Sequence, residues 1–317
     1  MKTGVVDVPW LGSHIRVLYS VPLNACSEVV AFPGDGVPWP SWPVLPGASS
    51  DSHPHSGGLL AALAARSEFA ASALFVLEPG CVDPFAIYDN ILPYGSLTEC
   101  GDPQAGRYEG TGGAAARAIN AAVMTAWAHA AMDGICATLP VLAIGFSKGG
   151  VVLNQILAEL AQEPAEDEMD EAEAEASGWL RRLRQVHYLD VGVQTAGAHL
   201  TQRELIAALG RRAATAGTPL PAICVHGTPR QWRDPSRPSI RGEMILSVDL
   251  MREAGLQVHA HEYLEHEPRS MAMHFDIVRC FAVAEPADHE DGLGLGVGHG
   301  ESACEPEAAG SSAPSQK

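Results

Sequence analysis

Basic residues are scarce in this sequence. Its 317 residues include 20 Lys and Arg against 38 Asp and Glu, which gives a formal net charge of −18 at pH 7. Nucleic-acid binding relies on Lys and Arg to neutralise phosphates, so this balance argues against a nucleic-acid partner. Much of the negative charge lies in two segments, the run Glu163–Glu175 and the chain from Glu285 onward. The remainder is only mildly acidic, so the two segments are predicted to lie outside the folded core.

Cysteine is sparse and shows no paired spacing. The seven cysteines are odd in number and none forms a C-x-x-C pair, which excludes a disulfide framework or a zinc knuckle and favours a reducing compartment. A short D-x-H-x-H pattern, made by Asp51, His53 and His55, lies in a loop rich in Pro and Ser. A metal site needs further convergent ligands and supporting residues. The sequence therefore predicts neither a metal nor a cofactor.

Long apolar runs are absent as well. No stretch approaches eighteen uninterrupted apolar residues, so no integral membrane segment is predicted. The first residues, Met1–Trp10, hold one lysine and no apolar run of secretory length. They resemble neither a signal peptide nor an arginine-rich transit peptide, and the sequence alone predicts a cytoplasmic location.

The chain is 46% hydrophobic, enough for a large core, and its pattern alternates between strands and helices. Predicted strands cover 5–10, 14–21, 28–32, 73–77, 140–146, 186–189, 220–226 and 257–263. Predicted helices cover 59–69, 113–132, 149–161, 201–214, 242–254 and 271–283. Strands that alternate with helices form right-handed crossovers, so we expect an α/β protein with a mostly parallel sheet and helices on both faces. The domain is predicted to span residues 1–283, with an acidic surface insert at 163–178 and a disordered acidic, glycine-rich tail at 284–317.

The most informative segment joins the apolar strand predicted over 140–146 to a helix through the pattern G-x-S-x-G. Such a nucleophile elbow places Ser147 on a sharp turn, and it requires Gly145 and Gly149 because a Cβ at either position would clash. The turn also brings the N–H of Lys148 to the place where an oxyanion would form. This context predicts an α/β-hydrolase-like fold with Ser147 as its nucleophile.

A second oxyanion donor is expected from the loop after an early strand. The turn that follows strand 28–32 offers the N–H groups of Asp35 and Gly36. The carboxylate of Asp35 would oppose a developing negative charge if it pointed into the site.

In this fold the serine is followed along the chain by the acid and then by the histidine. His274 opens the last predicted helix, which is where the general base belongs. Its rivals are His259 and His261 on the last predicted strand and His266 in the loop beyond it.

Two aspartates compete for the role of the triad acid. Asp234 follows predicted strand 220–226, and Asp190 ends predicted strand 186–189. Both therefore lie at the carboxyl edge of the sheet, where the active sites of open α/β sheets form. Asp234 is slightly favoured, because the acid usually follows the later strand.

The chain resembles the family of the vertebrate mitochondrial chromosome 2 open reading frame 69 protein. The resemblance is strongest over Gly145–Gln155, and it continues through Tyr188-Leu189-Asp190, Arg233-Asp234-Pro235 and His274-Phe275. It spans roughly residues 28–283. It implies an α/β-hydrolase-like fold with a serine nucleophile, supports Asp234 and His274, and implies a mitochondrial location. The substrate of that family is not established.

These observations predict a serine hydrolase of the esterase, thioesterase, lipase or amidase kind. Its substrate would be a small-molecule or lipid-like acyl compound, attacked by Ser147 with His274 as base and Asp234 or Asp190 as acid. The alternative is a catalytically silent protein of the same fold that acts by binding a partner, because a fold does not fix a function.

Overall fold

The computed structural model describes residues 1–36, 56–82, 84–92, 97–104, 108–132, 138–164, 169–193, 195–215 and 220–283. Residues Met1–Phe281 form one compact unit. The predicted tail at 284–317 and the D-x-H-x-H pattern at 51–55 lie outside the described residues, so the expectations about them remain predictions.

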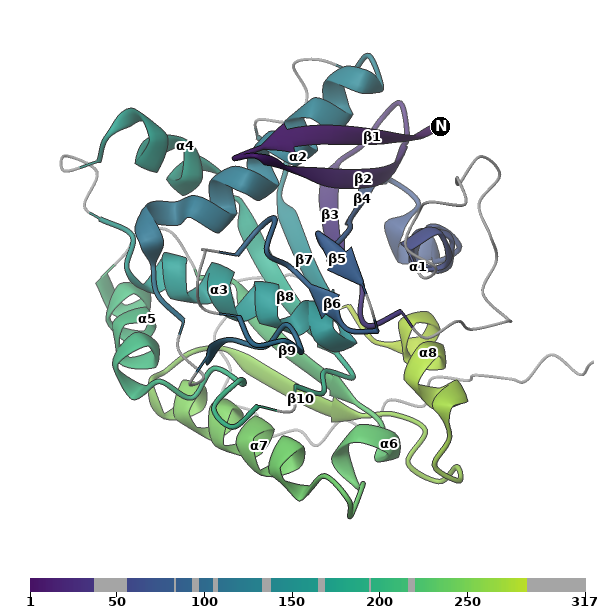
Figure 1. Cartoon of the computed structure of the whole chain (residues 1–317), viewed down its shortest axis with the longest axis vertical. Coiled ribbons are helices and arrows are strands. Elements are labelled where there is room, and N and C mark those ends of the chain that lie inside the picture. The colour runs from purple at the N-terminus through teal and green to yellow at the C-terminus, as the bar shows by residue number, and fades with distance from the viewer. Residues whose placement is uncertain are drawn as a thin grey trace, which may run out of the picture. The chain divides into compact units, whose positions relative to one another are not determined.

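An eight-stranded sheet forms the centre of this unit (Figure 1). In spatial order it contains β1 (Lys2–Trp10), β2 (Ser13–Val21), β4 (Ser72–Leu77), β3 (Ser27–Phe32), β7 (Val141–Phe146), β8 (Leu183–Leu189), β9 (Ala222–Gly227) and β10 (Val258–Glu262). Within this sheet β2 alone runs against the direction of the other strands, because its pairings with β1 and β4 are antiparallel and all other pairings are parallel. This order and direction are those of the α/β-hydrolase fold, which confirms the predicted fold class.

The composition of the strands follows their burial. Every residue of β4 is buried, and β7 is almost wholly buried, as expected for central strands that are covered on both faces. β1 at the edge is largely exposed or half-buried and mixes polar with apolar side chains. The central strands are consequently continuous apolar runs in the sequence, and this is why they could be predicted from it.

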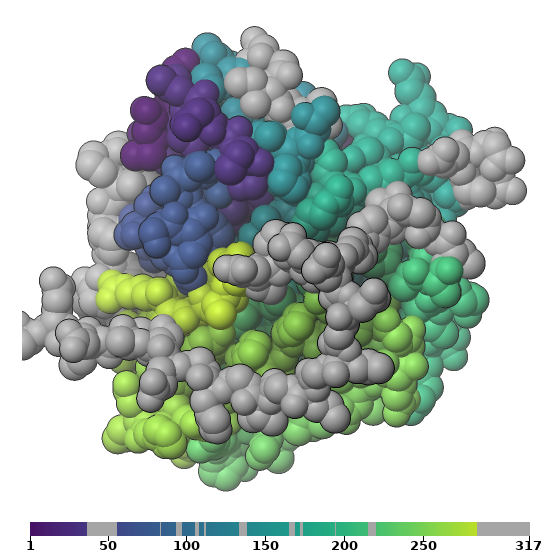
Figure 2. All heavy atoms as spheres, turned by 180° about the vertical axis from the view of Figure 1, so that it is seen from behind, coloured from purple at the N-terminus to yellow at the C-terminus, as the bar shows by residue number. Residues whose placement is uncertain are grey.

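Helices cover both faces of the sheet. One face packs against α2 (Ala114–His129), α3 (Gly150–Ala161), α5 (Arg203–Thr215) and α7 (Pro238–Glu253), as Figure 1 shows. The other face carries α1 (Ser56–Ala64) and α8 (Met271–Cys280), which contact each other and lie side by side in Figure 2. Among the described residues, none of these helices combines the length and apolar character that a membrane crossing requires.

The structure corrects the prediction of an acidic surface insert at 163–178, because only part of this segment lies on the surface. Residues Glu171–Leu180 form helix α4, which packs on α2 and buries Ala176 and Trp179. Glu163 also has a buried side chain, which forms ion pairs with Arg181 and Arg212. These contacts could not be predicted from the acidic run. The apolar residues of α4 lie only at its end, and the basic partners of Glu163 come from distant segments.

A buried polar contact anchors the amino ends of the parallel strands. The carboxylate of Glu28, at the start of β3, accepts hydrogen bonds from Trp127 Nε1 at 2.9 Å and from Arg182 Nη1 at 2.8 Å. Burial raises the pKa of Glu28, and the charge of Arg182 acts against that rise. The three side chains link β3, α2 and the start of β8 at the end of the sheet opposite Ser147.

Candidate active site

Ser147 follows β7 in a left-handed backbone conformation. Its φ is +52°, which is uncommon for a residue with a side chain and marks a strained position held by its surroundings. A 3₁₀ turn over Ser147–Gly149 leads directly into α3. The strand, turn and helix therefore have the arrangement that the sequence predicted for the elbow.

The two glycines of G-x-S-x-G are required by close backbone approach. A Cβ on Gly145 would lie 2.8 Å from the carbonyl oxygen of Gly149, and a Cβ on Gly149 would lie 2.1 Å from the carbonyl oxygen of Phe32. Gly34, after β3, approaches the serine itself, because a Cβ there would lie 3.0 Å from Ser147 Oγ. The turn after β3 and the turn after β7 thus pack directly against each other.

Substituting Gly149 by alanine should destabilise the protein by about 1–3 kcal/mol, the usual cost of forcing extra volume into a packed site. The new methyl group meets the backbone of Phe32, which cannot move aside as a flexible side chain can. Gly242→Ala is the matched control: this helical glycine is exposed and has open space around its Cβ position. The control should be neutral or gain about 0.4–1 kcal/mol. Urea unfolding of both variants measures the difference, and equal stabilities would contradict the packing argument.

His274 and Asp190 meet across two elements of the fold. His274 lies on α8, whose first turn is capped by Ser270, and its Nδ1 atom is 2.6 Å from Asp190 Oδ2. Both side chains are buried. With Nδ1 donating to the carboxylate, the lone pair of the imidazole is on Nε2, which is the tautomer that a general base requires.

Asp190 is fixed by several contacts besides His274. Its Oδ1 atom accepts hydrogen bonds from Thr228 N at 2.8 Å and from Thr228 Oγ1 at 3.0 Å. Its own N–H donates to the carbonyl of His226 at 2.7 Å, and its φ of +44° turns the side chain back toward β9. The loops after β8 and β9 therefore hold the carboxylate in one orientation, which in turn orients the imidazole.

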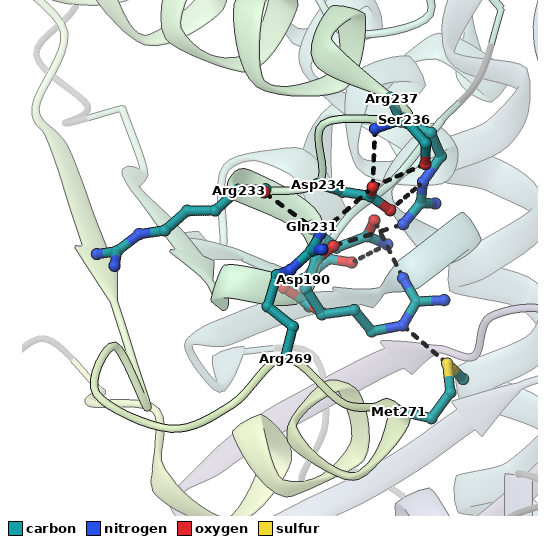
Figure 3. Close-up of polar contacts among 9 residues, drawn as sticks. Asp190, Gln231, Arg233, Asp234, Ser236, Arg237, Arg269 and Met271 are labelled. Atoms are coloured by element: carbon teal, nitrogen blue, oxygen red, sulfur yellow. Dashed lines mark hydrogen bonds and ion pairs between the residues drawn. The ribbon is translucent and has the colours of Figure 1, made fainter.

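The carboxylate of Asp234, which the sequence favoured, contacts side chains other than His274 (Figure 3). Its carboxylate accepts hydrogen bonds from Ser236 N and Oγ and forms ion pairs with Arg237 and Arg269. The hydrogen bonds from Ser236, together with Arg237, hold the pKa of Asp234 well below its usual range. The short helix α6 (Pro229–Trp232), absent from the sequence prediction, separates Asp234 from the end of β9. The geometry therefore replaces Asp234 by Asp190 as the candidate acid.

The rival histidines lie away from this pair. His259 and His261 are on β10, where His259 contacts Gln257 and His261 stacks on His226. His266 is almost fully exposed and pairs with Glu265. His274 is thus the histidine that the fold brings to Asp190.

Phe146, the residue before Ser147, contacts His274. The Phe146 ring packs on the imidazole with 4.7 Å between ring centroids. Within the described part of the chain, Ser147 Oγ and His274 form no direct hydrogen bond. Catalytic hydrogen bonds are often long in unliganded enzymes and tighten when substrate binds.

The predicted oxyanion donors differ in their availability. The N–H of Gly36 donates to the carbonyl of Pro84 at 3.2 Å, so Lys148 and Asp35 are the better candidates. The Asp35 carboxylate accepts a hydrogen bond from Ala86 N at 2.9 Å. Burial raises the pKa of Asp35, opposed by that hydrogen bond and by the charge of Lys148.

The sequence prediction missed the role of the Lys148 side chain. Its ammonium forms a buried ion pair with Asp102, whose other oxygen accepts hydrogen bonds from Thr195 N and Oγ1 at 3.0 and 2.8 Å. Asp102 lies in an irregular segment with no motif to single it out. The ion pair fixes the residue whose N–H is a candidate oxyanion donor.

Replacing Asp102 by asparagine should destabilise the protein by about 3–5 kcal/mol, because it leaves the buried Lys148 charge without its counter-ion. Asp7→Asn is the control, since it removes an ion pair with Arg16 whose side chains are 29% and 51% exposed. An exposed pair contributes about 0–1 kcal/mol. Thermal and urea unfolding compare the two variants, and a similar small loss in both would show that Lys148 has another means of compensation.

The middle of the chain is similar to a known protein family. The model of the C2orf69 family matches residues 104–257. These residues are similar to that family. This segment includes Ser147, Lys148, Asp190 and Asp234, whereas His274 follows it.

Proteins of that name are similar to this chain. The mouse mitochondrial protein C2orf69 homolog is 31% identical over 152 residues, which cover 47% of this chain and 36% of the mouse protein. The zebrafish homolog is 33% identical over 138 residues, or 44% of this chain and 37% of that protein. The chain therefore matches about a third of the length of these relatives.

Solved esterase structures are similar at low sequence identity. The Pyrobaculum calidifontis esterase has a TM-score of 0.43 at 12% identity and covers 83% of this chain and 75% of its own. A putative carboxylesterase from Lactobacillus plantarum has a TM-score of 0.44 at 13% identity and covers 89% of this chain and 93% of its own.

Proposed function

We propose that this protein is a serine hydrolase that cleaves an ester, thioester or amide of a small-molecule or lipid-like acyl compound. The observation that carries the proposal is the buried contact of 2.6 Å between His274 Nδ1 and Asp190 Oδ2. The pair lies at the same edge of the sheet as Ser147, whose left-handed conformation is that of a nucleophile elbow.

In the proposed reaction, Ser147 Oγ attacks the substrate carbonyl carbon and its proton passes to His274 Nε2. The resulting oxyanion accepts hydrogen bonds from the N–H groups of Lys148 and Asp35. The intermediate then collapses, the leaving group takes the proton from Nε2, and the acyl group stays on Ser147. Water attacks this acyl-enzyme with His274 again as base, which restores the serine hydroxyl and releases the acid. Asp190 orients the imidazole and stabilises its charged form throughout.

A second function is favoured by one specific observation. Among the described residues, Ser147 and His274 share no direct hydrogen bond, as expected for a silent relative of the fold that acts by binding a partner. The two functions make opposite predictions for an activity-based probe.

A fluorophosphonate should label Ser147 of the full chain. The oxygen of an activated serine attacks the phosphorus of the probe and displaces fluoride, which leaves a phosphonate ester on the serine. The probe therefore reports the nucleophile without knowledge of the substrate. Labelling followed by peptide mapping should find the adduct on the wild type and on Ser67→Ala, a control at an exposed serine, but not on Ser147→Ala. Absence of labelling in folded wild-type protein would favour the silent alternative, and equal labelling of the Ser147 variant would exclude Ser147.

The relatives are named mitochondrial proteins, and we propose the same location for this chain. The cytoplasmic location predicted from the sequence has no support from these relatives. Imaging of the full-length natural protein with a mitochondrial marker tests the proposal.

A further inference from the structure

Three potential metal ligands are buried together on the sheet face that α1 and α8 cover. His187 lies on β8, and Cys224 and His226 lie two residues apart on β9. The register pairs His187 with Cys224, so the three side chains project from the same face. Their ligand atoms all lie within 4.8 Å of one another, and no residue of the three is more than 1% exposed. Central parallel strands normally place Val, Ile or Leu at such positions.

The two imidazoles face each other and are supported from behind. His187 Nδ1 is 3.0 Å from His226 Nε2. The opposite nitrogens contact oxygen atoms: His187 Nε2 is 2.8 Å from Gln185 Oε1, and His226 Nδ1 is 3.0 Å from Tyr263 Oη. Metal-binding histidines almost always use their second nitrogen in this way, which fixes the ring and its tautomer.

We propose that His187, Cys224 and His226 form a binding site for a zinc-type divalent cation. Two imidazole nitrogens and one sulfur make a set that suits Zn²⁺, with the fourth position open to water or another ligand. Two nitrogens bound tetrahedrally at 2.0–2.1 Å stand about 3.3 Å apart, so the rings need only a small separation to admit the ion. The sequence predicted no metal, because the C-x-H pair and the distant His187 become a cluster only through strand pairing.

The protonation changes on binding are simple. The ion replaces the thiol proton of Cys224, which leaves to solvent, and the proton between the facing nitrogens moves to His226 Nδ1, where Tyr263 Oη accepts it. His187 keeps its proton on Nε2 toward Gln185.

A positive charge lies near the cluster but is engaged elsewhere. The Arg66 guanidinium donates to the carbonyls of Val278 and Phe281 and lies 4.0 Å from the Phe281 ring centroid. The Phe281 ring in turn packs against both His187 and His226. The thiolate of Cys224 would offset the repulsion between Arg66 and a bound cation.

Metal titration of the chelator-treated full chain tests this site. We expect one equivalent of Zn²⁺ to bind and to raise the melting temperature, because an ion that binds only the folded state stabilises it. Co²⁺ in place of Zn²⁺ should give the absorption bands of a tetrahedral site and a thiolate-to-metal charge-transfer band, which reports Cys224 directly. Failure of the wild type to bind one equivalent would overturn the proposal.

Variants separate a metal site from a simple hydrogen-bonded cluster. Cys224→Ser should lose the charge-transfer band, and His187→Gln should lose tight binding, whereas Cys280→Ser on α8 should retain both. Tyr263→Phe keeps the ring but removes the supporting oxygen, so it should weaken Zn²⁺ binding by about 10–100-fold. A band that persists in Cys224→Ser would overturn the proposal. If that variant does not fold, the spectrum of the wild type and the Tyr263→Phe titration still decide. These measurements do not involve Ser147, so the hydrolase proposal can fail without affecting them.

Discussion

Turnover of a chromogenic ester should fall by on the order of 10⁶ when Ser147 is replaced by alanine, the loss measured on removing the nucleophile from a serine triad. Alanine has no oxygen to carry the acyl group, so the two-step route through an acyl-enzyme is closed. The oxyanion donors and the binding surface remain, and they leave some acceleration over water. Hydrolysis of p-nitrophenyl acetate by the two proteins measures the effect.

The fold of the Ser147→Ala variant should be unaffected, because alanine removes a single oxygen atom. Circular dichroism and the melting temperature verify this, and Ser67→Ala serves as the control for a serine outside the site. Wild-type turnover in Ser147→Ala would show that hydrolysis arises elsewhere on the molecule or from a contaminant.

Asp190→Asn should lower turnover by on the order of 10⁴, whereas Asp234→Asn should remain close to the wild type. Asparagine at position 190 would present an amide to His274 and favour the tautomer that cannot accept the serine proton. Asp234 makes its contacts with Ser236, Arg237 and Arg269 instead. The kinetics of the two variants on the same ester therefore distinguish the acids that the sequence left open.

Asp190 also holds the loop after β9 through Thr228, so a loss of activity could arise from unfolding. Urea unfolding of Asp190→Asn addresses this, and the pH–rate profile provides a second readout. A variant with an unchanged fold and a lowered rate across the profile supports the orienting role. A larger loss in Asp234→Asn than in Asp190→Asn would reverse the assignment.

Most of the fold could be predicted from the sequence because its central strands are short, apolar and bounded by turns. The need for a glycine on each side of Ser147 could also be predicted, because it follows from backbone contacts within a few residues and with the adjacent strand. The chain order predicted His274 as the base, and the structure brings its imidazole to Asp190. These features depend on local chemistry, which a single sequence displays directly.

The choice of acid and the buried ion pair could not be predicted in the same way. Asp190 and Asp234 both follow strands, and what distinguishes them is a positive φ at Asp190 and one short helix, α6, before Asp234. Asp102 meets Lys148 from 46 residues away in the chain. Such contacts depend on how loops of irregular sequence pass over the sheet, and no periodicity encodes that path.

The Glu28 contact with Trp127 and Arg182 implies that the two ends of the sheet have different roles. The amino ends of the strands hold a polar anchor that contributes to folding, while the serine, the histidine and both aspartates lie at or beyond the carboxyl ends. Selection can therefore alter the loops at one end without dismantling the scaffold at the other. In evolutionary terms, the architecture is evolvable: descendants of such a chain could exchange or abandon chemistry and still inherit the same fold.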